Sequence, residues 1–179
     1  MNARALRTAI LALGAVAAAG AAASCSQPPG DARIGVVAPD LAQFPPVGDL
    51  LGRRCGTLDC HGAATRSLQI LGCEGLRLGD GKPGCRSAGG TDTTAEEYTS
   101  TYRSIVGLEP AVMSAVVQSK GAHPELLTLV RKARGDEAHK GGRVFVPGDD
   151  QDDCLATWLA GATDVAACTR GMAAPVIPR

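Results

Sequence analysis

Apolar side chains recur every three or four residues over much of the chain, which is the spacing of amphipathic helices. Residues 47–60 form the first such segment. The next begins where Thr93 or Thr94 supplies a capping hydroxyl and two glutamates supply an acidic first turn. Prolines open two further helices, at Pro110 and near Pro124. The pattern predicts a mainly helical domain.

The last predicted helix begins with the acidic run at residues 149–153 and contains Trp158. Residues 66–90 lack a helical period and are rich in turn-forming residues, which favours irregular structure. We therefore predict a mainly α fold, a small helical domain with long loops, over residues 47–168. We expect residues 169–179 to form a disordered C-terminal tail.

The first 24 residues have the pattern of a secretion signal peptide. Two arginines precede an apolar run that is too short and too weakly hydrophobic for a stable membrane span. The run ends in small residues followed by Cys25, a sequence that resembles the lipobox of bacterial lipoproteins. The resemblance implies cleavage before Cys25 and acyl chains on its sulfur, which anchor a protein to a membrane. Ordinary signal cleavage nearby, without lipid, is the alternative.

Residues 25–46 contain five prolines and few periodic apolar positions, so we predict a tether between the anchor and the domain. By resemblance to sorting rules in well-known bacteria, Ser26 after the lipid cysteine indicates a periplasm-facing lipoprotein of the outer membrane. Removal of the signal takes two arginines from a chain of zero formal charge and leaves −2 over 155 residues. That charge excludes a strongly basic nucleic-acid-binding protein.

The segment from Cys55 to Gly62 carries the most specific chemical signal in the chain. Covalent haem attachment needs two thiols, which add to the porphyrin vinyl groups, and a histidine directly after the second cysteine as iron ligand. Cys60 and His61 meet the second requirement, although four residues separate the cysteines where the usual motif has two. Two other interpretations stay open: a disulfide between Cys55 and Cys60 beside an incidental histidine, and a metal or redox-thiol site.

Seven cysteines are an odd number, which in an exported protein asks for an explanation. With Cys25 assigned to lipid and two cysteines to haem, four remain, and they form two local pairs. We predict disulfides between Cys73 and Cys85 and between Cys154 and Cys168. The other two connectivities that four cysteines permit stay open.

The order of these parts resembles class I cytochrome c domains, particularly the haem-binding domains in exported proteins of planctomycetes and myxobacteria. The resemblance covers residues 47–161 and rests on Cys60-His61-Gly62, His139-Lys140-Gly141-Gly142 and Trp158-Leu159-Ala160-Gly161. It implies that the first and last helices pack together and hold one covalent haem c. It also implies that Cys55 and Cys60 form the thioether bonds and that His61 is the proximal iron ligand.

The sixth iron ligand in such domains is a methionine on a loop shortly before the last helix, and in this chain His139 occupies that place. We therefore expect His139 as the second metal ligand, with a solvated loop residue as the alternative. Met113 fits an apolar helix face, which favours a core position. Met172 falls in the predicted tail, and His123 precedes Pro124 as a helix-entry residue.

These expectations describe a membrane-tethered, periplasmic monohaem electron carrier that exchanges single electrons with periplasmic redox proteins. The alternative is a haem-free lipoprotein, stapled by disulfides, with a structural or binding role. We do not expect an enzyme, because the chain contains no Ser-His-Asp order, phosphate-binding loop or paired-carboxylate signature above chance.

Overall fold

The computed structural model describes residues 35–79 and 84–175. The predicted signal peptide and Cys25 lie outside the described residues. Within those residues the chain forms six α-helices, three 3-10 helices and no strand, which confirms the prediction of a mainly helical fold. No helix in these two ranges is both long and apolar enough to span a bilayer. In chain order, the elements are η3 (Leu41–Gln43), α2 (Pro45–Cys55), η4 (Arg86–Ala88), α3 (Ala95–Val106), α4 (Pro110–Gln118), η5 (Pro124–Leu126), α5 (Thr128–Arg134), α6 (Asp150–Ala160) and α7 (Val165–Ala173).

Three of the six α-helices in the described residues, α3, α4 and α6, begin where the sequence predicts a cap or a proline. Thr94 and Glu97 form a capping box at the start of α3, in which each side chain accepts a hydrogen bond from the other's backbone N–H. The Asp149 carboxylate accepts two N–H groups in the first turn of α6. Pro110 opens α4. The helix expected near Pro124 begins later, because Pro124 opens η5 and α5 follows it.

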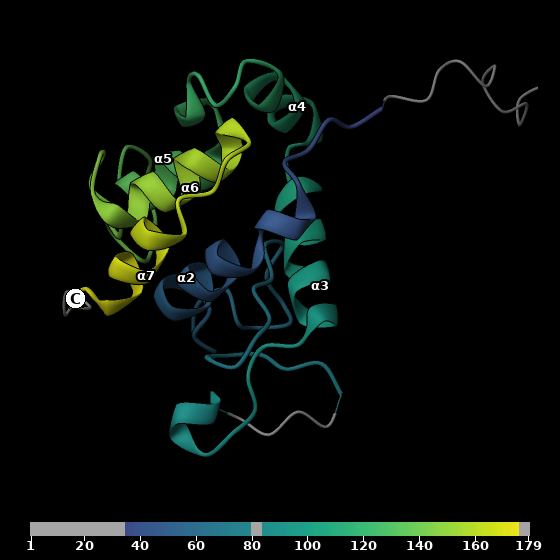
Figure 1. Ribbon diagram of the computed structural model, residues 1–179, viewed down its shortest axis with the longest axis vertical. Helices are drawn as coiled ribbons and strands as arrows, with labels where there is room; N and C mark the ends of the chain where they lie inside the picture. The colour runs from purple at the N-terminus through teal and green to yellow at the C-terminus, as the bar shows by residue number, and fades with distance from the viewer. Residues whose placement is uncertain (1–34, 80–83, 176–179) are drawn as a thin grey trace, which may run out of the picture. The chain divides into compact units, whose positions relative to one another are not determined.

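Helix α2 contacts α3, α6 and α7, and α6 also packs against α7 and α4 (Figure 1). An aromatic cluster fills the space between α2, α3 and α6. The ring centroid of Phe44 lies 5.1 Å from that of Trp158 and 5.7 Å from that of Tyr102. Phe44 and Trp158 are fully buried, so three of the chain's five aromatic residues form one core contact in which large apolar areas are removed from water.

The folded part begins before residue 47, so the predicted tether is too long. Residues from Val36 onward belong to the same compact unit as the helices. The backbone carbonyl of Asp40 accepts the indole N–H of Trp158 at 3.2 Å, and Phe44 lies in the core. The prolines misled the prediction because Pro45 stands in the first turn of α2, where a missing N–H costs nothing.

The folded part also extends beyond residue 168, so the predicted C-terminal tail is wrong over its first half. Residues Val165–Ala173 form α7, and the predicted disulfide between Cys154 and Cys168 joins it to α6. The buried guanidinium of Arg54 on α2 donates to backbone carbonyls at the end of α7, those of Gly171, Ala174 and Pro175. These bonds satisfy carbonyl groups that a helix end leaves unpaired.

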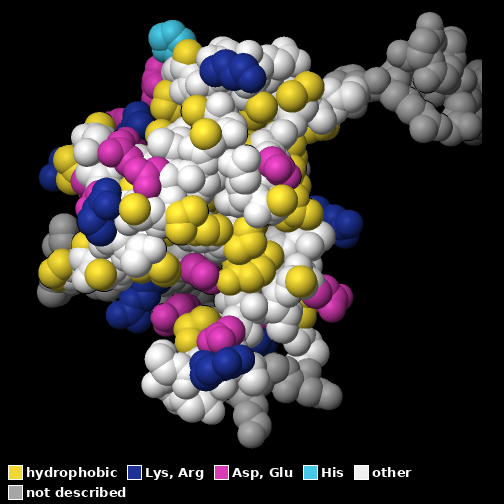
Figure 2. Space-filling model, in the orientation of Figure 1, with side chains coloured by type: hydrophobic (Ala, Val, Ile, Leu, Met, Phe, Trp, Pro, Cys, Tyr) yellow, Lys and Arg dark blue, Asp and Glu magenta, His cyan; other side chains and the backbone are white. Residues whose placement is uncertain are grey.

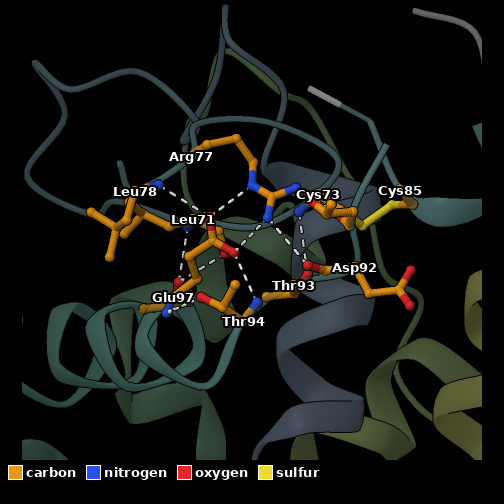
Figure 3. A network of polar contacts seen from close by, with 11 residues as sticks. Leu71, Cys73, Arg77, Leu78, Cys85, Asp92, Thr93, Thr94 and Glu97 are labelled. Carbon is orange, nitrogen blue, oxygen red and sulfur yellow. Dashed lines mark hydrogen bonds and ion pairs between the residues drawn. A yellow bond between two sulfur atoms is a disulfide. The ribbon is translucent and has the colours of Figure 1, made fainter. Parts of the chain in front are cut away.

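Between α2 and α3 the described residues form no α-helix or strand, which agrees with the irregular structure predicted for residues 66–90, and side-chain bonds hold them in place (Figure 3). The predicted disulfide between Cys73 and Cys85 closes a loop within this segment. The Arg77 guanidinium makes two hydrogen bonds to the Glu97 carboxylate, at 2.7 and 3.1 Å, and Glu97 is fully buried. Thr101 of α3 accepts the Leu71 N–H at 2.9 Å. The segment that carries His61 is thereby fastened to α3.

Candidate functional site

The four residues between Cys55 and Cys60 fold into a closed turn. Helix α2 ends at Cys55, and the chain reverses so that the His61 N–H donates to the Cys55 carbonyl at 3.0 Å. The Cys60 and Gly62 N–H groups both donate to the carbonyl of Thr57, at 2.9 and 3.0 Å. The four residues between the two cysteines therefore form a turn that brings Cys60 and His61 back to the end of α2, where Cys55 lies.

Close backbone packing behind this turn requires glycine. A Cβ atom at Gly62 would collide with the carbonyl oxygen of Gly56, and one at Gly75 would collide with the same oxygen. Glycine is the residue that allows backbones to approach so closely. The turn is thus packed from two sides against Gly56, and this packing fixes the start of the His61 segment.

A cavity of about 300 Å³ opens beside the turn. Its volume is at the lower end of the range for small-molecule and cofactor sites, roughly 300 to 1,000 Å³. The walls come from the end of α2, the His61 segment, the start of α4, helix α5 and the loop that follows α5. The lining residues are Cys55, His61, Ser67, Leu68, Leu108, Glu109, Thr128, Leu129, Lys132, Ala133, His139 and Val144.

His61 and His139 stand beside each other in this cavity although 78 residues separate them. Their ring centroids are 5.8 Å apart and their planes differ by 21°. Two imidazoles that bind one metal ion from opposite sides, each through a nitrogen at about 2 Å, have centroids about 6 Å apart. The observed centroid separation is close to that value, and the near-parallel planes are also those of two stacked rings.

A backbone carbonyl orients each ring. The Nδ1 atom of His61 lies 3.1 Å from the carbonyl oxygen of Leu68, and Nδ1 of His139 lies 3.4 Å from that of Gly142. Because a carbonyl oxygen only accepts, each Nδ1 carries the proton and Nε2 is the basic nitrogen. Metal-binding histidines commonly have this arrangement, in which one ring nitrogen donates to a carbonyl and the other binds.

Burial keeps the His61 imidazole neutral. Removal from water lowers its pKa below 6.5, the hydrogen bond to the Leu68 carbonyl partly opposes this, and the nearby His139 lowers it further. A neutral imidazole is the form that binds metal. The local environment therefore favours the ligating form of His61 over a wider pH range than in water.

Polar groups of α5 and of the turn before α4 lie at the edge of the cavity. The Glu109 carboxylate accepts the Thr128 N–H at 2.7 Å and its hydroxyl at 2.9 Å, so it caps α5 in place of Leu127, which has no side chain able to do so. The Lys132 ammonium lies 2.8 Å from the Glu137 carboxylate. These contacts place α5 against the loop that carries His139.

The other candidates, Cys60 among them, do not line this cavity. Met113 is buried in the core on α4, as predicted. Met172 lies on α7, beyond the expected end of the fold, and lines a second cavity of about 290 Å³. His123 is exposed and precedes η5, with its Nδ1 atom 3.1 Å from the Glu125 carboxylate. Cys60 is half-buried on the turn next to His61.

The described residues around the cavity offer too few ligands for a bare metal ion. In the described residues no group of three or more His, Cys, Asp or Glu side chains could hold a metal. Haem iron needs fewer protein ligands, because the porphyrin supplies four nitrogens and the protein supplies the axial positions. Towards that requirement the cavity offers two neighbouring histidines, one cysteine and several aliphatic side chains.

No known protein family, curated protein or solved structure matches the chain. The resemblance to class I cytochrome c domains therefore stays a prediction from the sequence motifs.

Sequence reasoning missed the groups that orient the two histidines. The carbonyls of Leu68 and Gly142 carry no residue-specific signal, because every residue has one. Glu109 offered a weak signal, since Leu127 cannot cap α5 and some other acceptor must. Its identity depends on the tertiary arrangement, which places Glu109 next to Thr128 across 19 residues.

Proposed function

We propose that the protein is a membrane-tethered, periplasm-facing monohaem electron carrier of the c type. The observation that carries this proposal is the pair His61 and His139, which line one cavity with ring centroids 5.8 Å apart. Cys55 in the cavity wall and Cys60 beside His61 supply the two thiols that covalent attachment needs.

Each part of the site has a role in this proposal. Cys55 and Cys60 would hold the porphyrin through thioether bonds, and His61 and His139 would bind the iron through Nε2. The bound haem supplies an iron centre that changes its charge by one electron. The aliphatic side chains of Leu68, Leu129 and others around the cavity would limit water access, and the carbonyl groups at Nδ1 would orient both rings.

The partners in this proposal are periplasmic redox proteins. The carrier accepts one electron from a reduced partner and passes it to an oxidised one, so no bond in either partner is made or broken. Acidic and basic side chains are interspersed on the face drawn in Figure 2. The face drawn there lacks the concentrated basic surface that nucleic-acid binding needs.

The test is expression of the full chain in a periplasm that contains haem-maturation machinery, followed by absorption spectra before and after dithionite. We expect a Soret band, sharp α and β bands on reduction, and haem stain that stays with the polypeptide on a denaturing gel. The control carries Cys55→Ser and Cys60→Ser and should lose the stain. A colourless wild-type protein would refute the carrier and leave the haem-free, disulfide-stapled lipoprotein as the better interpretation.

A further inference from the structure

His139 lies on a loop between α5 and α6 whose ends are fixed and whose middle is exposed. Gly135 ends α5 with a positive φ of 78°, and Gly142 has a positive φ of 62°. Beyond the loop, the Val144 and Phe145 N–H groups donate to the Ala133 carbonyl at 2.8 and 2.9 Å. These contacts fix the two ends of the loop. They do not fix its middle, which carries His139.

Glu137 connects the middle of this loop to α5. Its carboxylate lies 3.0 Å from Nε of Arg131 and 2.8 Å from Nζ of Lys132. The same Lys132 ammonium donates to the Ala138 carbonyl at 3.0 Å. Two cations from the last turn of α5 thus hold the two residues that directly precede His139.

Arg131 is itself fixed, so it provides a rigid attachment point. Its Nη1 atom donates to the backbone carbonyls of Glu125 and Leu126, at 3.1 and 2.6 Å, and its Nη2 atom donates to the Thr128 hydroxyl at 2.8 Å. The guanidinium is therefore held by η5 and the start of α5 before it meets Glu137. A partner that is already ordered loses less conformational freedom when the ion pair forms.

We propose that Glu137 is a positioning residue that keeps His139 on the iron, and that the loop releases His139 to an added ligand when the Arg131–Glu137–Lys132 contacts are lost. The inference rests on the proposed function, because it assumes haem between His61 and His139. Glu137 itself does not line the cavity. It acts through the backbone that carries His139.

The test is the rate at which cyanide binds to the ferric, haem-loaded protein, since cyanide needs the position that His139 occupies. Glu137→Gln should speed binding by about five- to tenfold, because exposed ion pairs are individually weak and two are lost together. Glu125→Gln is the matched control: it removes the same charge from an exposed glutamate whose carboxylate contacts His123 and not the loop. Glu137→Asp should restore part of the slow rate.

Salt and hydrogen exchange provide two further measurements. Raising ionic strength should speed cyanide binding to the wild type, because salt screens exposed charges, and should change Glu137→Gln much less. Amide exchange over residues 135–142 should quicken in Glu137→Gln and not in Glu125→Gln, a measurement that does not depend on haem.

The two proposals fail in different ways. A wild-type protein without covalent haem overturns the proposed function. A haem-loaded Glu137→Gln protein with wild-type cyanide kinetics and wild-type exchange in the loop overturns the positioning role of Glu137 and leaves the carrier intact. Equal acceleration in Glu125→Gln also overturns it, because the effect would then come from net charge.

Discussion

Individual residues of the site divide into those that sequence can reveal and those that it cannot. His61 is revealed by its place after Cys60, and the structure puts it in the cavity wall. His139 was selected by its position before the last helix, and the structure brings it to 5.8 Å from His61 between ring centroids. The carbonyl groups that orient both rings depend on the path of two loops, which local sequence does not specify.

Gly62 offers a test of the packing behind the motif turn. Gly62→Ala places a methyl group against the Gly56 carbonyl, so we expect a loss of about 1 to 3 kcal/mol in the free energy of unfolding. Gly52→Ala is the matched control, because nothing lies within 4 Å of its added Cβ and alanine favours the interior of α2 by about 0.5 to 1 kcal/mol. Urea denaturation of both variants measures the difference. Equal effects would show that the turn is not tightly packed.

Glu97 offers a test by pH. Burial raises the pKa of its carboxyl group, but hydrogen bonds from the Thr94 N–H, Arg77 and the Leu78 N–H outweigh burial and hold the pKa below the ordinary 4.5. A group with a depressed pKa in the folded state stabilises the fold above its unfolded pKa, and this contribution is lost as pH falls. The wild type should therefore lose stability as pH falls below about 4.5.

The measurement is the free energy of unfolding from about pH 6 to pH 3, for the wild type and for Glu97→Gln. We expect the variant to be less stable at neutral pH by about 3 kcal/mol, because Arg77 loses its buried counter-charge. Its stability should also fall less steeply with acid than that of the wild type. If stability fell equally steeply with acid in the wild type and in Glu97→Gln, Glu97 would not be the group whose protonation destabilises the fold.

At the scale of helices, capping residues and prolines were the local signals that predicted helix starts correctly. The Thr94 cap, Pro110 and the Asp149 cap each mark a helix start in the structure. Helix α7 was missed because its sequence is rich in alanine and has few large apolar residues. Its place depends on contacts with α2 and α6 and on the bonds from Arg54, which are long-range features.

The disulfide between Cys154 and Cys168 tests the role of α7. Replacing both cysteines by serine should lower the free energy of unfolding by about 3 kcal/mol, because the loop that they close is 14 residues long. Amide exchange should quicken in α7. The control, Cys73→Ser with Cys85→Ser, should leave exchange in α7 unchanged, since that bond lies in the segment before α3. Unchanged exchange in α7 of the first variant would show that packing alone holds the helix.

The whole molecule shows why the boundaries of the domain were the weakest prediction. The prolines before residue 47 and the small residues after Cys168 have the composition of linkers, yet Phe44 is fully buried and Gly171 is buried as well. Composition depends on the segment alone, whereas burial depends on which surfaces of the rest of the chain pack against it. For the candidate site, the structure brings His61 and His139 into one cavity, and the haem motif that suggested His61 stays a prediction.

The central claim is that one haem is held between His61 and His139, and the electron paramagnetic resonance spectrum of the ferric protein tests it most directly. With ring planes that differ by 21°, two imidazole ligands should give a rhombic low-spin signal, which nearly parallel ligand planes produce. His139→Ala should convert the signal to high spin while the thioether-bound haem remains. A high-spin wild type, or a low-spin signal that His139→Ala leaves unchanged, would contradict the account.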